Sequence, residues 1–165
     1  MNDFVLCYNR LHGYSVSAGS TDCRADIVFV LGMSGNYNFN LAKSLLYQLV
    51  GSLNIGDEYS RVGVVTYSTT VKTTIYLKTY YSAASLQRAI SSLPYSGSQY
   101  VNTAGSLAYV RTTMLSTSTG ARYNVPKVVV VLTAGTSTDI TYTKVSITAH
   151  TFGYLYWRSI LSGYF

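Results

Sequence analysis

The sequence predicts an α/β fold built on a doubly wound, mostly parallel sheet with one antiparallel edge hairpin. Three apolar runs of strand length are well separated along the chain: DIVFVL at 26–31, RVGVVTY at 61–67 and KVVVVLT at 127–133. Several segments between these runs repeat apolar residues at intervals of three and four, which is typical of amphipathic helices. Strands that alternate with helices favour a parallel sheet covered on both faces.

The first strand, 26–31, runs into a small polar turn, Ser34-Gly35-Asn36, and a helix is predicted to follow. One face of this helix is expected to carry the apolar residues spaced by three and four: Phe39, Ala42, Leu46, Leu49 and Leu53. Capping of its first backbone N–H groups is expected from Ser34, Asn36 or Asn38. A strand, a polar turn and a helix in this order form the place where α/β proteins often hold a ligand.

The second strand, 61–67, continues through the turn Ser68-Thr69-Thr70 into the alternating segment 71–78. The less polar face of that segment is expected to hold Val71, Thr73, Ile75 and Leu77. The other face is expected to hold Lys72, Thr74, Tyr76 and Lys78. Alternation together with two lysines predicts an antiparallel edge strand.

Two further helices are predicted, one from about Ser82 and one from about Thr103, where Thr103 and Ser106 are expected to act as capping residues. After the strand at 127–133, a last strand is predicted at 145–152 and a short helix at 154–165. The linker between these two strands is too short for a parallel crossover, which needs a dozen residues or more. Either a helix is missing there or 145–152 is not a parallel strand, so the C-terminal part is expected to be truncated.

The predicted organisation is an irregular leader or linker at 1–24 and one domain at 25–165. The leader holds both cysteines, Cys7 and Cys23, which either form a local disulfide in a secreted protein or remain free thiols. The N-terminus lacks the layout of a signal peptide, so secretion would imply that this chain is a fragment.

Composition excludes several classes of function. The chain has 12 basic and 6 acidic residues, for a net charge of +6, and its bases are scattered, so nucleic-acid binding is not expected. No apolar run reaches the length of a membrane span, and no GxGxxG or Walker loop occurs. His12 and His150 have no acid–nucleophile constellation around them, and GMSGN only superficially matches a nucleophile elbow, so an enzyme is not expected. The 17 tyrosines indicate an interface, a crosslinkable surface or compositional drift.

Four pieces of the sequence together resemble the von Willebrand factor A domain: CRADIVFVLGMSGN, SRVGVVTYSTTVKTTIYL, VNTAGSLAYVRTTM and VPKVVVVLTAGTSTD. They cover about 23–152 in the family's order. The amino-acid sequences of these pieces most resemble A domains of extracellular matrix proteins: collagen VI-like chains, matrilins, and invertebrate shell or byssus matrix proteins. The resemblance implies a Rossmann-like fold, secretion and a role in cell adhesion or protein binding.

Many members of that family bind Mg²⁺ at a metal-ion-dependent adhesion site (MIDAS). The resemblance places its five ligand positions at Gly32, Ser34, Asn36, Val101 and Ala134. Only Ser34 keeps the family's residue type, and both carboxylates are lost. Because Mg²⁺ needs carboxylate oxygens, the site is expected to be degenerate and to hold no cofactor. Asp139 lies in the loop after the last ligand position and is the one acidic residue expected to be able to reach the site; Asp26, Asp57 and Glu58 are expected at the opposite end of the sheet.

The expected function is therefore a non-enzymatic extracellular interaction domain that binds matrix partners, collagen-like ones included, without a metal. The expected binding rim consists of 32–36, 100–103 with Thr103, and 134–137, where hydroxyls, amides and helix-terminal N–H groups could hold an anionic group. The alternative is a structural matrix component that self-associates through its Tyr-rich surface. A degenerate copy with no binding role is the third possibility.

Overall fold

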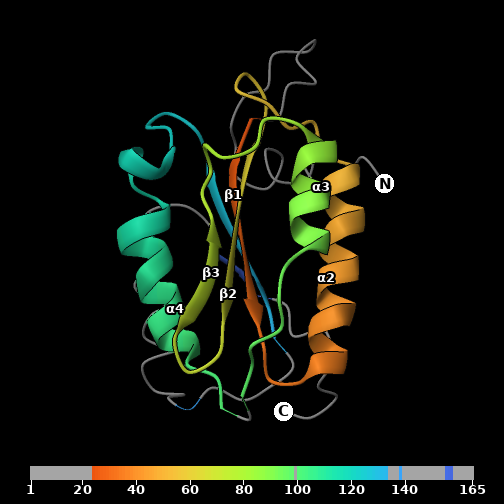
Figure 1. Ribbon diagram of the computed structural model, residues 1–165. Helices are drawn as coiled ribbons and strands as arrows, with labels where there is room; N and C mark the ends of the chain where they lie inside the picture. The colour runs from red at the N-terminus through yellow and green to blue at the C-terminus, as the bar shows by residue number, and fades with distance from the viewer. Residues whose placement is uncertain (1–23, 99, 134–137, 139–154, 158–165) are drawn as a thin grey trace.

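A computed structural model describes residues 24–98, 100–133, 138 and 155–157, and its strands form one sheet in the order β3-β2-β1-β4-β5 (Figure 1). The strands are β1 (Asp26–Gly32), β2 (Arg61–Tyr67), β3 (Val71–Ile75), β4 (Lys127–Leu132) and β5 (Leu155–Trp157). The central strand β1 pairs in parallel with β2 and β4, β5 pairs in parallel with β4, and β3 is antiparallel to β2. The predicted mostly parallel sheet with one antiparallel edge is confirmed.

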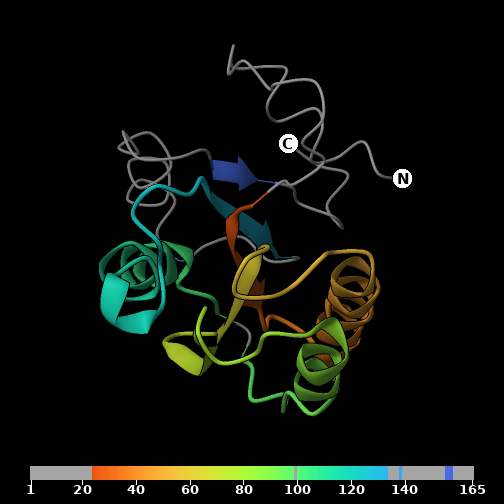
Figure 2. The ribbon, with the colours of Figure 1, turned by 90° about the horizontal axis from the view of Figure 1, so that it is seen from above.

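Helices cover both faces of this sheet, as Figure 2 shows from above. One face carries α2 (Asn36–Gly51) and α3 (Ala83–Ser91). The other carries α4 (Thr103–Tyr109), which continues into a π-helical turn at Val110–Met114 and is followed by a short 3₁₀ turn at Thr117–Thr119. Within the described residues, these helices are too short or too polar to cross a bilayer.

The sheet separates two apolar cores because neighbouring side chains of a strand point to opposite faces. Every residue of β1 is buried: Phe29 and Leu31 pack against α2 and α3, while Val28 and Val30 pack on the side of α4. A strand that is buried on both faces has no polar face, which explains why its sequence is a continuous apolar run rather than an alternating one.

The predicted apolar face of α2 is correct at Phe39, Ala42 and Leu46 but wrong at Leu49, and the predicted Leu53 lies beyond the end of the helix at Gly51. Phe39 and Leu46 are buried as expected, but Leu49 is 37% exposed, while its neighbour Val50 is fully buried. The reason is the helical repeat of 3.6 residues: about eleven residues after Phe39 three turns are complete, so Val50 returns to the same face and Leu49 lies on its flank.

The predicted alternation of the edge strand is wrong at its start. The register of β2 and β3 shifts between Thr66 and Tyr67, so a β-bulge inserts an extra residue near the beginning of β3. Val71 therefore packs in the core beside α4, whereas Ile75 packs in the core beneath α2 and α3. A bulge moves the strand residues that follow it to the other face, and no pattern in the single strand reveals it. β3 also ends at Ile75 rather than at the predicted residue 78, and Leu77 beyond it packs in the core beside α4.

The predicted C-terminal helix at 154–165 is wrong at 155–157, where β5 lies beside β4. Residues 133–154 between the two strands are numerous enough for a parallel crossover, so the short linker that suggested truncation does not arise for this pairing. The predicted strand at 145–152 lies outside the described residues, as do Cys7, Cys23 and the predicted leader up to residue 23.

Candidate functional site

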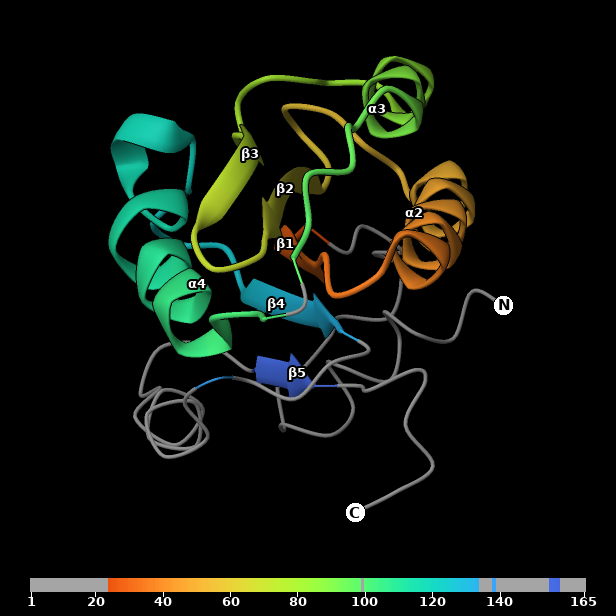
Figure 3. The same ribbon diagram turned by 60° about the horizontal axis from the view of Figure 1, so that its bottom comes forward.

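The described part of the predicted rim lies at the carboxyl end of the parallel strands, where the turn after β1 and the loop before α4 approach the end of β2 (Figure 3). The turn after β1 is fixed to β2 because the Met33 N–H donates to the Tyr67 carbonyl at 2.8 Å. The loop before α4 is fixed to the end of β2 through Asn102, whose N–H donates to the Ser68 carbonyl at 2.7 Å. The structure therefore brings together the first two of the three predicted rim segments; the third, 134–137, lies outside the described residues.

The turn Ser34-Gly35-Asn36 opens α2 without a side-chain cap. Gly35 is the N-cap, and no side-chain oxygen bonds to the first N–H groups of the helix. The Asn36 amide oxygen instead accepts from the Asn40 amide at 3.1 Å, one turn along the exposed surface. The predicted capping by Ser34, Asn36 or Asn38 is wrong, and the N–H groups at the start of α2 face the rim uncapped.

A second loop, 94–98, lies over the end of β1. A Cβ on Gly97 would collide with the Met33 carbonyl, so only glycine allows this close approach of two backbones. Tyr95 in the same loop packs its ring against Phe39 with centroids 5.7 Å apart. The loop was not among the predicted site segments, although its run of Tyr, Ser and Gly is typical of binding loops.

Val101 and Thr103 frame the start of α4 and are both buried. Val101 offers only its carbonyl, which accepts from the Thr138 N–H at 2.9 Å and from the Thr138 hydroxyl at 3.2 Å. The cap of α4 is Asn102, whose side-chain oxygen accepts from the Gly105 N–H at 2.8 Å. The predicted capping by Thr103 and Ser106 is therefore wrong, and the Thr103 hydroxyl is available for another contact.

That contact is with Tyr67, whose hydroxyl lies 3.0 Å from the Thr103 hydroxyl in the core. Burial raises the pKa of the Tyr67 phenol above 10.0, and hydrogen bonds with Thr103, Thr133 and Ser106 oppose that rise. These four residues form the hydroxyl cluster. Tyr67 and Thr133 were missed from the sequence, although each stands at the end of a predicted strand that adjoins Gly32.

The hydroxyl cluster lies beside Gly32, the position at which the resemblance would place the family's first carboxylate. A Cβ on Gly32 would lie 2.8 Å from the Thr133 hydroxyl and 3.2 Å from the Tyr67 hydroxyl. The described oxygen groups at this end are neutral: hydroxyls, backbone carbonyls, and the side-chain amides of Asn36 and Asn102, whose oxygens already accept from Asn40 and from the Gly105 N–H. This set does not fit Mg²⁺, whose hydration shell only carboxylates displace readily. Ala134 and Asp139 lie outside the described residues.

The acidic residues that the structure describes lie at the other end of the sheet. Asp26 is fully buried, and its carboxylate binds the Arg122 guanidinium at 2.8 Å and Lys127 at 3.5 Å. Asp57 pairs with Arg61, and Glu58 pairs with Arg24. Across the described parts of the chain, His, Cys, Asp and Glu do not gather in any group of three that could hold a metal.

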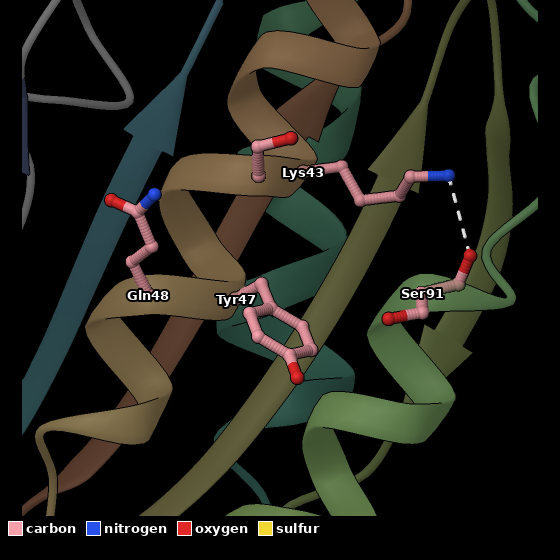
Figure 4. Close-up of a pocket in the computed structure, with 5 residues that line it drawn as sticks. Lys43, Tyr47, Gln48 and Ser91 are labelled. Carbon is pink, nitrogen blue, oxygen red and sulfur yellow. Dashed lines mark hydrogen bonds between the residues drawn. The ribbon is translucent and has the colours of Figure 1, made fainter.

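A shallow pocket lies away from the rim, on α2 and the end of α3 (Figure 4). Tyr47 of α2 points toward α3, and the Lys43 ammonium donates to the Ser91 carbonyl at 3.4 Å. Gln87 donates to the Tyr47 carbonyl at 2.9 Å. These contacts brace the two helices against each other, so the pocket is a by-product of helix packing and supplies no converging chemistry.

Comparison with known families gives a match over most of the chain. The sequence model described as the von Willebrand factor type A domain matches residues 26–155. Cochlin of Bos taurus is 36% identical over an alignment of 124 residues that covers 73% of this chain and 22% of cochlin. Matrilin-3 of Gallus gallus is 31% identical over an alignment of 131 residues that covers 74% of this chain and 29% of that protein. The chain thus spans less than a third of the length of these relatives.

Solved structures of proximal thread matrix protein 1 from the mussel byssus share the fold. One superposes with a TM-score of 0.75 at 21% identity, covering 87% of this chain and 39% of that chain. Another, described as having a zinc-occupied MIDAS motif, gives a TM-score of 0.70 at 22% identity and covers 78% of this chain and 35% of that chain. The zinc belongs to that structure of the byssus protein.

Proposed function

The chain belongs to the von Willebrand factor type A domain family, and from this premise we propose that it is a non-enzymatic interaction domain of the extracellular matrix that binds its partner without a metal. The observation that carries the proposal is the hydroxyl cluster beneath Gly32. Neutral hydroxyls take the position of the charged ligands, so the rim keeps its shape and loses its affinity for a hard cation.

In place of a metal, the rim offers exposed aromatic rings and uncharged hydrogen-bonding groups. Tyr37 and Tyr100 flank it and are 80% and 62% exposed, and Tyr95 stands beside them on the loop over Met33. The residues between them are mainly Ser, Asn and Gly. Surfaces with this composition recognise proteins through rigid aromatic rings and adaptable hydrogen bonds, as antibody paratopes do.

The uncapped start of α2 adds a preference for negative charge. Its first N–H groups carry no side-chain cap and form the positive end of a 16-residue helix. An acidic group of a matrix partner can be held there directly, where a metal-dependent relative would use a bridging cation. Collagen-like segments that carry acidic side chains are therefore proposed as ligands of the rim.

The proposal is tested by measuring binding of an acidic collagen-like peptide with and without EDTA. Equal affinity in both conditions is expected, together with a loss of affinity of about tenfold for Tyr100→Ser, since exposed aromatic anchors often contribute more than about 1 kcal/mol. Tyr123→Ser, which changes an exposed tyrosine at the other end of the sheet, is the matched control and should bind normally. Strict dependence on Mg²⁺ would overturn the proposal.

A second candidate function is supported by the exposed tyrosines that lie away from the rim, among them Tyr59, Tyr81 and Tyr123. Tyrosine is enriched at protein interfaces because its ring is apolar and its hydroxyl bonds to polar groups. We propose self-association through such a surface as the alternative. Oligomers that depend on concentration and not on any added ligand would favour it.

A further inference from the structure

We infer that Ser98 is a positioning residue of the rim, which holds the backbone of Tyr100 in place so that the exposed Tyr100 ring is ordered before a partner binds. The inference rests on the proposed function, in which Tyr100 contacts the partner. Ser98 stands in the loop 94–98, which was not among the predicted site segments.

The Ser98 side chain bonds twice to the backbone of Tyr100. Its hydroxyl donates to the Tyr100 carbonyl at 2.7 Å, and its oxygen accepts from the Tyr100 N–H at 3.3 Å. A serine that bonds to the backbone two residues further on closes a local turn. Because both bonds end on the backbone, they fix the residue and leave its ring, which is 62% exposed, free to contact a partner.

The chain on either side of Tyr100 is anchored at the carboxyl end of the sheet. On one side, Gly97 lies so close to the Met33 carbonyl that a Cβ would collide with it. On the other side, the Asn102 N–H donates to the Ser68 carbonyl at 2.7 Å. The two bonds from the serine hydroxyl therefore act on a short stretch whose ends are already fixed.

The other two tyrosines of the rim also have ordered supports. Tyr37 lies in the first turn of α2, and the Tyr95 ring packs against Phe39 with centroids 5.7 Å apart. Ordering side chains and loops on association costs free energy, and a surface that is already ordered avoids that cost. Tyr100 precedes α4 and its ring is exposed, so its order depends on the bonds made by its backbone.

The test begins with the affinity of Ser98 variants for the acidic collagen-like peptide. Ser98→Ala should lower the affinity about threefold to tenfold, because the Tyr100 ring then occupies its place in only part of the free molecules. Ser98→Thr keeps the hydroxyl and should bind as tightly as the parent chain. Ser96→Ala, which changes an exposed serine of the same loop, is the matched control and should also bind normally.

A double-mutant cycle shows whether Ser98 acts through the Tyr100 ring. Tyr100→Ser removes the ring but keeps the backbone groups to which Ser98 bonds. In the Tyr100→Ser background, Ser98→Ala should therefore cause little further loss of affinity. A serine that served only the stability of the loop would lower the affinity by the same factor in both backgrounds.

A second measurement needs no ligand: the NMR order parameter of the Tyr100 amide in the free chain. It should be about 0.85, as in rigid backbone, in the parent and in Ser98→Thr, and below about 0.6 in Ser98→Ala. An order parameter that Ser98→Ala leaves unchanged, or equal losses of affinity in both backgrounds, would overturn the inference. Strict dependence of binding on Mg²⁺, with the order parameters as expected, would reject only the metal-free binding proposal.

Discussion

Each end of the sheet holds a buried polar group that joins distant segments, but the group is a charged carboxylate at one end and a neutral phenol at the other. At the amino-terminal end a buried carboxylate, Asp26, is surrounded by Arg122 and Lys127. At the carboxyl end a buried phenol, Tyr67, is surrounded by neutral hydroxyls, with Thr103 at 3.0 Å. Each group fastens loops that are far apart in the sequence to the central strands.

This difference shows that a buried charged group and a buried neutral group need different partners. A buried carboxylate requires cations and hydrogen bonds to offset its lost hydration, and Asp26 receives them from both a side chain and the Arg122 backbone N–H at 2.7 Å. A buried hydroxyl needs one or two partners and attracts no cation. The amino-terminal end is therefore stabilised by pairs of acids and bases, whereas the described hydroxyl cluster at the carboxyl end is neutral.

The largest expected effect comes from removing the charge of Asp26. Asp26→Asn leaves Arg122 and Lys127 partly buried without their counter-ion and should reduce the free energy of unfolding by about 3–5 kcal/mol. Urea unfolding measures it. Glu58→Gln is the control, because its pair with Arg24 is exposed and should be worth less than about 1 kcal/mol. Equal losses for the two variants would contradict the contrast between buried and exposed pairs.

A smaller loss is expected when Gly32 receives a side chain. The new Cβ of Gly32→Ala would lie 2.8 Å from the Thr133 hydroxyl, so packing must adjust at a cost of about 1–3 kcal/mol. Adding Thr133→Ala should recover part of that loss, and a double-mutant cycle measures the coupling. If the two changes were additive, Thr133 would not occupy the space beside Gly32.

Tyr67→Phe tests the hydroxyl cluster itself. Loss of one buried hydrogen-bonding group should reduce the free energy of unfolding by about 1 kcal/mol at neutral pH. Because burial raises the pKa of the Tyr67 phenol above 10.0, the unfolded chain releases this proton at a lower pH than the folded chain does. Stability should therefore fall as the pH rises above 10, and this component of the fall should vanish in Tyr67→Phe.

Chemical denaturation at a series of alkaline pH values measures that component. Tyr123→Phe is the matched control, since Tyr123 is almost fully exposed and its removal should leave the slope unchanged. A Tyr67→Phe variant with the slope of the parent chain would show that the buried phenol does not titrate differently in the folded state.

The smallest expected effect is that of divalent cations. Thermal-shift titrations with Mg²⁺, Mn²⁺ and Ca²⁺ should leave the melting temperature unchanged, because the described donors at the carboxyl end are neutral. A clear increase that disappears in Asp139→Asn would contradict this and identify Asp139 as a replacement ligand.

Much of the fold was predictable because it depends on local patterns. The apolar runs at 61–67 and 127–133 became β2 and β4 almost residue for residue, and the helix predicted from about Ser82 became α3, which begins at Ala83. The bulge in β3 was not predictable, since it depends on how two strands align. The strand at 155–157 was missed because a short edge strand takes its conformation from its neighbour.

The candidate site was likewise predictable from the sequence only in part. Gly32 and Val101 could be matched to ligand positions of the family from the sequence, and so could the absence of acids there. That Tyr67 and Thr133 occupy the space beside Gly32 could not be inferred, because three strand and helix ends must first be brought together. The helix caps were mispredicted for a related reason. Ser and Thr side chains can bond to several nearby groups, and the Thr103 hydroxyl bonds to the Tyr67 hydroxyl instead of capping α4.

The sequence by itself determined the order of strands and helices as far as β4, the family, and the residue types at the positions that the resemblance assigns as ligands, because these depend on periodicity and on identities along the chain. Only the tertiary structure decided which groups meet. Asp26 and Arg122 are 96 residues apart, and Tyr67 and Thr103 are 36 apart. Contacts over such separations follow from the packing of the whole sheet and its helices, which local patterns do not encode.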